Sequence, residues 1–137
     1  MADPRDLFDL TGRVACVTGA SAGLGQRAAV ALAAAGAQVV GVARRADALD
    51  AWAEATGPKA AVVAADLSDR SQTKEIAKKI AEPFGAPDIL VHAAGINTRE
   101  TADEVTAEGW DVTMNLNLAA PFFLSQAFAP AMKAKGW

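Results

Sequence analysis

Short apolar runs alternate along the chain with longer stretches that carry apolar residues at helical spacing. The short runs consist mainly of valine, isoleucine, leucine and alanine, without the polar alternation of a strand that has one solvated face. This pattern is typical of strands that are covered on both faces. The predicted strands span residues 13–18, 38–43, 60–65 and 88–92.

The stretches between these strands have the composition of helices. An alanine-rich stretch ends at Gly36 and a second stretch ends at Gly57-Pro58, and both endings are typical helix stops. A third stretch carries Ile76 and Ile80 among charged residues, as an amphipathic surface helix does. The predicted helices span residues 24–35, 47–56, 71–81 and about 106 to 133, the last bent at Pro121.

The alternation of strand and helix predicts a doubly wound α/β fold. Parallel strands joined by right-handed crossovers place helices on both faces of a sheet. There is no repeat, low-complexity tract or linker, so residues 1–137 are expected to form a single domain. We expect this domain to be incomplete at its C-terminus, with a sheet truncated after about four strands, because a fifth strand is due where the sequence stops.

Composition and charge narrow the class of protein. Hydrophobic residues make up 52% of the chain and charged residues 21%, which favours a folded core over disorder. A net charge of −3 argues against a nucleic-acid partner. The charged N-terminus lacks the apolar core of a signal peptide, so a cytoplasmic protein is expected. The single cysteine, Cys16, has no cysteine or histidine near it in sequence, so no disulfide and no metal site are expected.

One uncharged segment is long enough to be considered as a membrane span. Between Asp111 and Lys133 lie 21 residues without a charge. They include asparagine, serine, glutamine and proline, which are costly in hydrocarbon. We therefore expect a helix buried against protein and no membrane association.

A glycine-rich turn follows the first predicted strand, where residues 18–25 read Thr-Gly-Ala-Ser-Ala-Gly-Leu-Gly. Glycines in this position allow a tight turn, close approach of the backbone to phosphate, and close packing of helix on strand. The first amides of the helix then face a pyrophosphate with the positive end of the helix dipole behind them. The alternative is a plain strand-to-helix turn, while a P-loop is excluded because no Gly-Lys-Ser/Thr follows. The predicted cofactor contacts in the turn are Gly19, Ala20, Ser21, Ala22, Gly23, Leu24 and Gly25.

This turn resembles the Thr-Gly-x-x-x-Gly-x-Gly motif of the short-chain dehydrogenase/reductase family. Three further stretches fall where that family has its motifs: Asp66-Leu67, His92-Ala93-Ala94-Gly95 and Asn117. The resemblance implies a Rossmann-type fold, a nicotinamide cofactor, and hydride transfer to or from a small-molecule carbonyl or alcohol substrate. Residues 110–126 are also similar to gluconate and 2-deoxy-gluconate dehydrogenase-like members of the family.

The resemblance also implies individual roles. Asp66, with Leu67, is expected beside the adenine; the alternative is that Asp66 only starts the following helix. The backbone of Ala93, Ala94 and Gly95 is expected beside the cofactor ribose. His92-Ala93 replaces two asparagines of the family that brace the strand end, so the bracing must come from elsewhere. For His92 a structural role is favoured, because no carboxylate or serine partner is evident in the sequence.

The choice between the two nicotinamide cofactors depends on the end of the second strand. An acidic residue there binds the ribose hydroxyls and repels a 2′-phosphate. This chain has Ala43 followed by Arg44 and Arg45, and a guanidinium pairs favourably with phosphate. The sequence therefore favours NADP over NAD. The alternative is that both arginines are only solvated charges. Ala22 also argues against NADP, because it stands where NADP-binding relatives often carry a basic residue.

The chemistry of the resembling family uses a serine, a Tyr-x-x-x-Lys pair and a helix asparagine. The sequence contains no tyrosine, so only Asn117 matches, and the 137-residue chain alone is expected to be inactive. Pro121 follows four residues later and cannot donate to the carbonyl of Asn117, which favours a local irregularity of the helix. Asn115 is the competing candidate for the helix asparagine. The alternative for Asn117 is a structural role, with its side chain hydrogen-bonded inside the core.

Two other classes compete with an oxidoreductase. A non-catalytic nucleotide-binding or scaffold module is disfavoured by the unfinished sheet. A methyltransferase of the same fold calls for an acidic residue after the second strand, where the chain has Ala43-Arg44. The resemblance further implies a homo-oligomer, dimer or tetramer, when complete. Its expected contact is the last helix, through some of Phe122, Phe123, Phe128 and Met132.

Overall fold

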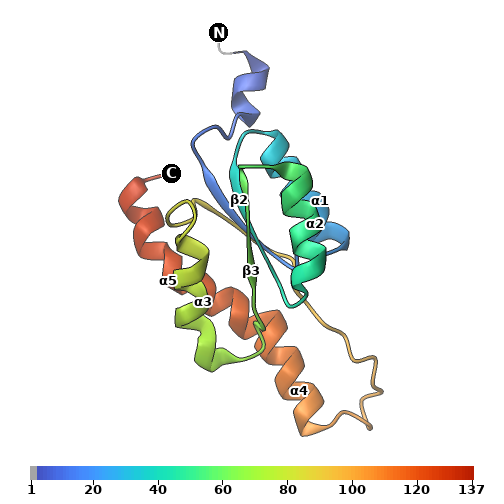
Figure 1. The fold of residues 1–137 in the computed structure, drawn as a ribbon. Helices are drawn as coiled ribbons and strands as arrows, with labels where there is room; N and C mark the ends of the chain where they lie inside the picture. The colour runs from blue at the N-terminus through green and yellow to red at the C-terminus, as the bar shows by residue number, and fades with distance from the viewer. Residues whose placement is uncertain (1–2) are drawn as a thin grey trace.

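Four parallel strands form a sheet in the order β3-β2-β1-β4 (Figure 1). This computed structural model describes residues 3–137. All four predicted strands are confirmed, with ends that shift by a residue at most. The strands are β1 (Val14–Thr18), β2 (Gln38–Ala43), β3 (Ala60–Ala64) and β4 (Ile89–His92).

The four predicted helices are present and depart from the prediction at two places, and the 3-10 helix η1 was not predicted. The helix expected over residues 71–81 begins with a 3-10 turn, and the side chain of Asp69 caps this turn by accepting a hydrogen bond from the amide of Ser71. The helix expected over residues 106–133 is interrupted by a turn of π-helix just before Pro121. The helical elements are η1 (Pro4–Phe8), α1 (Gly23–Ala34), α2 (Ala46–Thr56), η2 (Arg70–Gln72), α3 (Thr73–Ala81), α4 (Ala107–Met114), the π turn η3 (Asn115–Ala119) and α5 (Ala120–Lys135).

Helices cover both faces of the sheet, so the predicted doubly wound α/β architecture is confirmed (Figure 1). Helices α1 and α2 lie on one face, while α3 and α5 lie on the other. Successive strand residues alternate between the two cores: Val17 packs in the first and Cys16 in the second. Burial raises the pKa of the Cys16 thiol to about 12, so it behaves as a small apolar side chain.

The register of the strands brings their C-terminal ends together. Thr18 of β1 lies opposite Val42 of β2 on one side and His92 of β4 on the other. The chain leaves β1 toward β2 and later returns to the other side of β1, which makes the β1–β4 junction a topological switch point. In doubly wound sheets this is the place where ligands bind. Among residues 3–137, no helix is long and apolar enough to cross a membrane.

Candidate cofactor-binding site

The turn after β1 is built around two glycines that other residues cannot replace. Gly19 has a φ of 70°, and a Cβ there would lie 2.7 Å from the backbone nitrogen of Ala94. A Cβ on Gly25 would fall on the carbonyl oxygen of Gly19. The turn is therefore packed directly against the start of α1 and against the loop after β4.

The amides of this turn divide into two groups. Those of Gly19 and Ala20 both donate to the carbonyl of Val42, at 2.8 and 3.3 Å, so they hold the turn onto β2. The predicted contacts of these two residues with a cofactor therefore cannot run through their amides. Helix α1 begins at Gly23, and its first amides have no acceptor within the helix.

The start of α1 is open to an anion. The preceding residue is Ala22, whose side chain has no oxygen to cap the helix, and its backbone is extended, with φ −162° and ψ 168°. The first turn of α1 carries no acidic residue. Unpaired amides and the positive end of the helix dipole therefore remain without a side-chain acceptor.

A cavity of about 270 Å³ lies at the C-terminal ends of the strands. Nine of the residues predicted as cofactor contacts line it, drawn from the glycine turn and from the ends of β2, β3 and β4. These nine are Gly19, Ser21, Ala22, Arg44, Asp66, Leu67, Ala93, Ala94 and Gly95.

Five of the predicted contacts do not line this cavity. Ala20 is buried beneath the turn, and the side chain of Leu24 is 83% exposed and points into solvent. Gly23 and Gly25 sit at the start of α1 and contribute backbone only. Arg45, the N-cap of α2, is exposed outside the cavity. Leu24 therefore has no side-chain role here, and of the two arginines only Arg44 reaches the cavity.

Arg44 and Asp66 bring opposite charges to the same cavity. Hydrogen bonds from the side chain and backbone of Ser68 lower the pKa of Asp66, and the charge of Arg44 lowers it further. Asp66 Oδ1 accepts from the amide of Ser68 at 2.9 Å and from its hydroxyl at 2.7 Å. Asp66 is therefore an ionised acceptor held in a fixed orientation. The 3-10 turn η2 is capped by Asp69, so the alternative that Asp66 starts this helical segment is wrong.

The loop after β4 forms one wall of the cavity through Ala93, Ala94 and Gly95. The amide of Ala94 donates to the hydroxyl of Thr18, at 3.2 Å, which ties the wall to β1. At its far end the amide of Ile96 donates to Asn117 Oδ1 at 2.9 Å, and Asn117 Nδ2 donates to the Ile96 carbonyl at 2.8 Å. These contacts hold the wall at its middle and at its far end.

Asn117 lies in the middle of the π turn η3. The irregularity expected between Asn117 and Pro121 is therefore present, and it takes the form of a wider turn in which the amide of Ala120 donates to the carbonyl of Asn115. The side chain of Asn117 is exposed and bonded to the loop after β4, so the alternative of a bond inside the core is wrong.

His92 has a partner that the sequence did not reveal. Its Nε2 lies 3.0 Å from the hydroxyl oxygen of Ser125 on α5, a residue 33 positions away. Burial lowers the pKa of His92, which favours the neutral imidazole. His92 does not line the cavity, in agreement with the structural role favoured for it.

Sequence reasoning missed several residues of the site. Val42, Ala43 and Ala65 line the cavity because they end β2 or directly follow β3. Their position at the C-terminal ends of parallel strands was a signal that could have identified them. Leu116 enters from the π turn, and no local pattern indicates that this helix reaches the cavity.

The residues present fit a dinucleotide. The uncapped start of α1 lies next to Ala22, which lines the cavity, and supplies amide donors of the kind that a pyrophosphate needs. The absence of a Cβ at Gly19 allows the turn and the loop wall to meet, and the wall itself has only small side chains. Arg44 and Asp66 add a donor and an acceptor for the adenosine portion.

The chain belongs to the short-chain dehydrogenase family. The family described as short chain dehydrogenase matches residues 13–137, nearly the whole chain. This confirms the family resemblance read from the glycine turn and from the motifs that follow it.

Individual relatives agree with this assignment. The chain is 42% identical over 124 residues to 2-dehydro-3-deoxy-D-gluconate 5-dehydrogenase of Dickeya dadantii, covering 89% of this chain and 49% of that protein. It is 40% identical over 134 residues to gluconate 5-dehydrogenase of Gluconobacter oxydans, covering 96% and 52%. A solved structure of L-sorbose reductase from Gluconobacter frateurii, complexed with NADPH and L-sorbose, superposes with a TM-score of 0.87 at 32% identity, covering 94% and 51%. The chain thus spans about half the length of the relatives it matches.

Proposed function

We propose that this chain is the cofactor-binding portion of an NADP-dependent oxidoreductase that transfers hydride between the nicotinamide and a carbonyl or alcohol substrate. The observation that carries this proposal is the uncapped start of α1, whose N-cap residue Ala22 lines the cavity at the switch point of the sheet. The NADPH complex of L-sorbose reductase, a relative with the same fold, supports it.

In this proposal the residues of the chain hold and orient the cofactor. The amides of Gly23, Leu24 and Gly25 receive the pyrophosphate, and Ser21 adds a hydroxyl. Asp66 accepts from the adenine, and the backbone of Ala93–Gly95 lies along the ribose. The bound cofactor supplies the hydride donor or acceptor.

Arg44 is the residue that we propose selects NADP over NAD. It is exposed, lines the cavity and follows β2, where a 2′-phosphate is read in this type of fold. A charge-assisted hydrogen bond contributes about 1.5–3 kcal/mol. Because Arg44 is exposed, the lower end of that range applies, about a tenfold preference.

The substrate class that we propose is a polyhydroxylated small molecule, such as a sugar acid or a ketose. The support comes from relatives that carry gluconate, 2-dehydro-3-deoxy-gluconate and L-sorbose in their names. The test is a spectrophotometric assay of the intact protein with NADPH or NADP and a panel of polyols, sugar acids and ketones. Turnover with simple ketones but with no polyhydroxylated compound would contradict the substrate class.

We further propose that the 137-residue chain on its own has no dehydrogenase activity. It holds no tyrosine to act as the general acid or base that this family takes from a Tyr-x-x-x-Lys pair. The expected result is NADPH binding without NADPH oxidation above the buffer rate for any carbonyl tested. Steady turnover by this chain would show that another residue moves the proton, whereas binding without turnover by the intact protein would favour a nucleotide-binding module.

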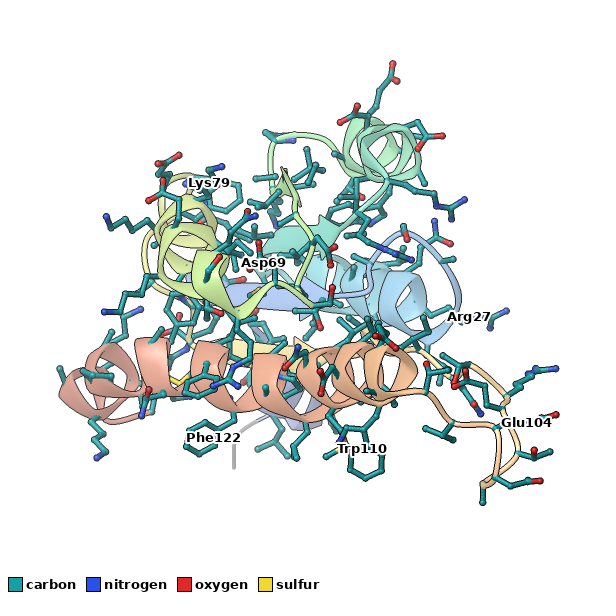
Figure 2. All side chains as sticks on the ribbon, turned by 90° about the horizontal axis from the view of Figure 1, so that it is seen from below. Arg27, Asp69, Lys79, Glu104, Trp110 and Phe122 are labelled. Carbon is teal, nitrogen blue, oxygen red and sulfur yellow. The ribbon has the colours of Figure 1, made fainter. Side chains whose placement is uncertain are left out.

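The outer face of α4 and α5 is proposed to contact another copy in a homo-oligomer. Trp110 and Phe122 point away from the sheet on this face (Figure 2). Their exposed fractions are 59% and 60%, and that of Leu118, in the π turn between them, is 60%. Of the four residues expected at this contact, Phe128 is buried against the sheet and is excluded. Sedimentation of the intact protein tests the oligomer, with Phe122→Glu as the variant expected to dissociate it.

A further inference from the structure

The wall of the cavity formed by Ala93, Ala94 and Gly95 has no polar side chain of its own. Its position is therefore set by the hydrogen bond from the Ala94 amide to Thr18 and by what holds its two ends. At one end, His92 in β4 contacts Ser125 at 3.0 Å, and at the other end Ile96 is held by Asn117. Both partners, Asn117 and Ser125, lie on the continuous helical segment from α4 to α5.

The π turn explains how one helix reaches both ends of the wall. Ser125 lies about two turns beyond Asn117, and in an uninterrupted α-helix the two side chains would be rotated apart by roughly 80°. A π turn accommodates an additional residue per turn and so reduces this offset. Asn117 consequently contacts the loop after β4, while Ser125 contacts the last residue of β4.

A small displacement of this wall would also displace the glycine turn, because the two are packed together. The position that a Cβ on Gly19 would occupy is within 2.8 Å of the backbone of Ala93 and 2.7 Å of that of Ala94. Turn and wall are thus in direct contact, and the space between them and β2 is the cavity. The pair His92–Ser125 fixes the end of β4 from which this wall begins.

We propose that His92 and Ser125 are positioning residues for the cofactor: their hydrogen bond fixes the wall at the separation from the glycine turn that the dinucleotide requires. Neither side chain lines the cavity, so both act through the backbone of Ala93–Gly95. The neutral imidazole, favoured by burial, can either donate to or accept from a serine hydroxyl. This inference rests on the proposed binding of a nicotinamide dinucleotide.

An isosteric pair of variants separates the hydrogen bond from packing. Ser125→Thr keeps the hydroxyl and Ser125→Val replaces it with a methyl group of the same shape, so both carry the same added bulk. Gln126→Ala, a change at an exposed neighbour on α5, is the control. NADPH affinity of the intact protein is measured by fluorescence titration, together with the amide resonances of residues 93–96 without cofactor and the urea midpoint of unfolding.

The expected result is that Ser125→Val binds NADPH roughly twofold to tenfold more weakly than Ser125→Thr, the range that one hydrogen bond of ordinary strength gives. The amide resonances of residues 93–96 should shift in the valine variant and stay near their wild-type positions in the threonine variant. His92→Phe should abolish the difference between the two variants.

Two other results would overturn the inference and are distinguishable. Equal NADPH affinities and equal amide shifts for the threonine and valine variants, with normal binding by the wild type, would leave the proposed function standing and show that the pair only stabilises the fold. Failure of the wild-type protein to bind NADPH or NADH would overturn the proposed function, and the positioning role with it.

Discussion

The side-chain amide of Asn117 makes both of its hydrogen bonds to one residue, accepting from the backbone nitrogen of Ile96 at 2.9 Å and donating to its carbonyl at 2.8 Å. This pairing joins the π turn to the loop that forms one wall of the cavity. Asn117 therefore has a structural role in this fold. This role is separate from the catalytic role that the family resemblance implies.

Replacement of Asn117 by alanine removes both hydrogen bonds to Ile96. The pair is exposed, so we expect a loss of about 1 kcal/mol in the free energy of unfolding. We also expect weaker NADPH binding, because the wall of the cavity is no longer held at this end. Urea unfolding and fluorescence titration measure the two effects. Asn115→Ala is the matched control, since no hydrogen bond of its side chain is found in the described part of the chain; an equal effect of both variants would contradict the assignment.

Replacement of Gly25 by alanine tests the packing of α1 on the turn. The added Cβ would fall on the carbonyl oxygen of Gly19, so the helix or the turn must move. Overpacking of this kind costs roughly 1–3 kcal/mol, and the movement should also abolish detectable NADPH binding. Arg27→Ala on the exposed side of α1 (Figure 2) should change neither quantity measurably. Normal cofactor affinity in Gly25→Ala would show that the turn does not form the phosphate site.

Arg44 and Arg45 offer a matched pair for testing cofactor choice. Arg44 lines the cavity and Arg45 does not, although both are exposed. We expect Arg44→Ala to weaken NADPH binding about tenfold while changing NADH binding less than about twofold. Arg45→Ala should leave both dissociation constants unchanged. Parallel losses for the two cofactors in Arg44→Ala would contradict the 2′-phosphate contact.

Asp88 makes the stability of the fold depend on acid pH. Burial alone would raise the pKa of Asp88, but hydrogen bonds from Lys135 and from the amide of Val14, with the charges of Lys135 and Arg13, lower the pKa below its usual value. A carboxyl with a lowered pKa in the folded chain stabilises the fold above its unfolded pKa of about 3.9, and this contribution is lost as the pH falls through the folded value.

We therefore expect the urea midpoint to fall as the pH is lowered from about 4.5 toward 2.5, and to fall less steeply in Asp88→Asn. Near pH 7 this variant should be less stable than the wild type, because Lys135 and Val14 lose a charged acceptor whose side chain is only 5% exposed. Asp50→Asn, on the surface of α2, is the control. Identical pH profiles for the wild type and Asp88→Asn would exclude this carboxylate as a source of the acid sensitivity.

The sequence predicted the sheet well because buried parallel strands have a plain local pattern. The runs around Val17 and Val40 are apolar on both faces, and Gly36 and Gly57 mark the helix ends between them. The glycine turn was readable at Gly25, which packs on Gly19 six positions earlier, whereas the close contact of Gly19 with Ala94 joins distant parts of the chain.

Contacts between side chains far apart in the chain could not be predicted from the sequence. The contact of His92 with Ser125 joins residues 33 positions apart, and nothing in either neighbourhood indicates it. The irregularity near Asn117 was predicted from Pro121, but its form as a π turn was not. Whether Arg44 or Arg45 faces the cavity depends on the twist of the chain between β2 and α2, which local sequence does not specify.

Titration of the isotopically labelled protein with NADPH, followed through its amide resonances, tests the central claim most directly. We predict that the largest shifts fall on residues 21–25, at the uncapped start of α1, with smaller shifts at Arg44, Asp66 and residues 93–95. Saturable binding that leaves residues 21–25 unshifted, or no binding at all, would contradict the account of this turn as the site of the dinucleotide phosphates.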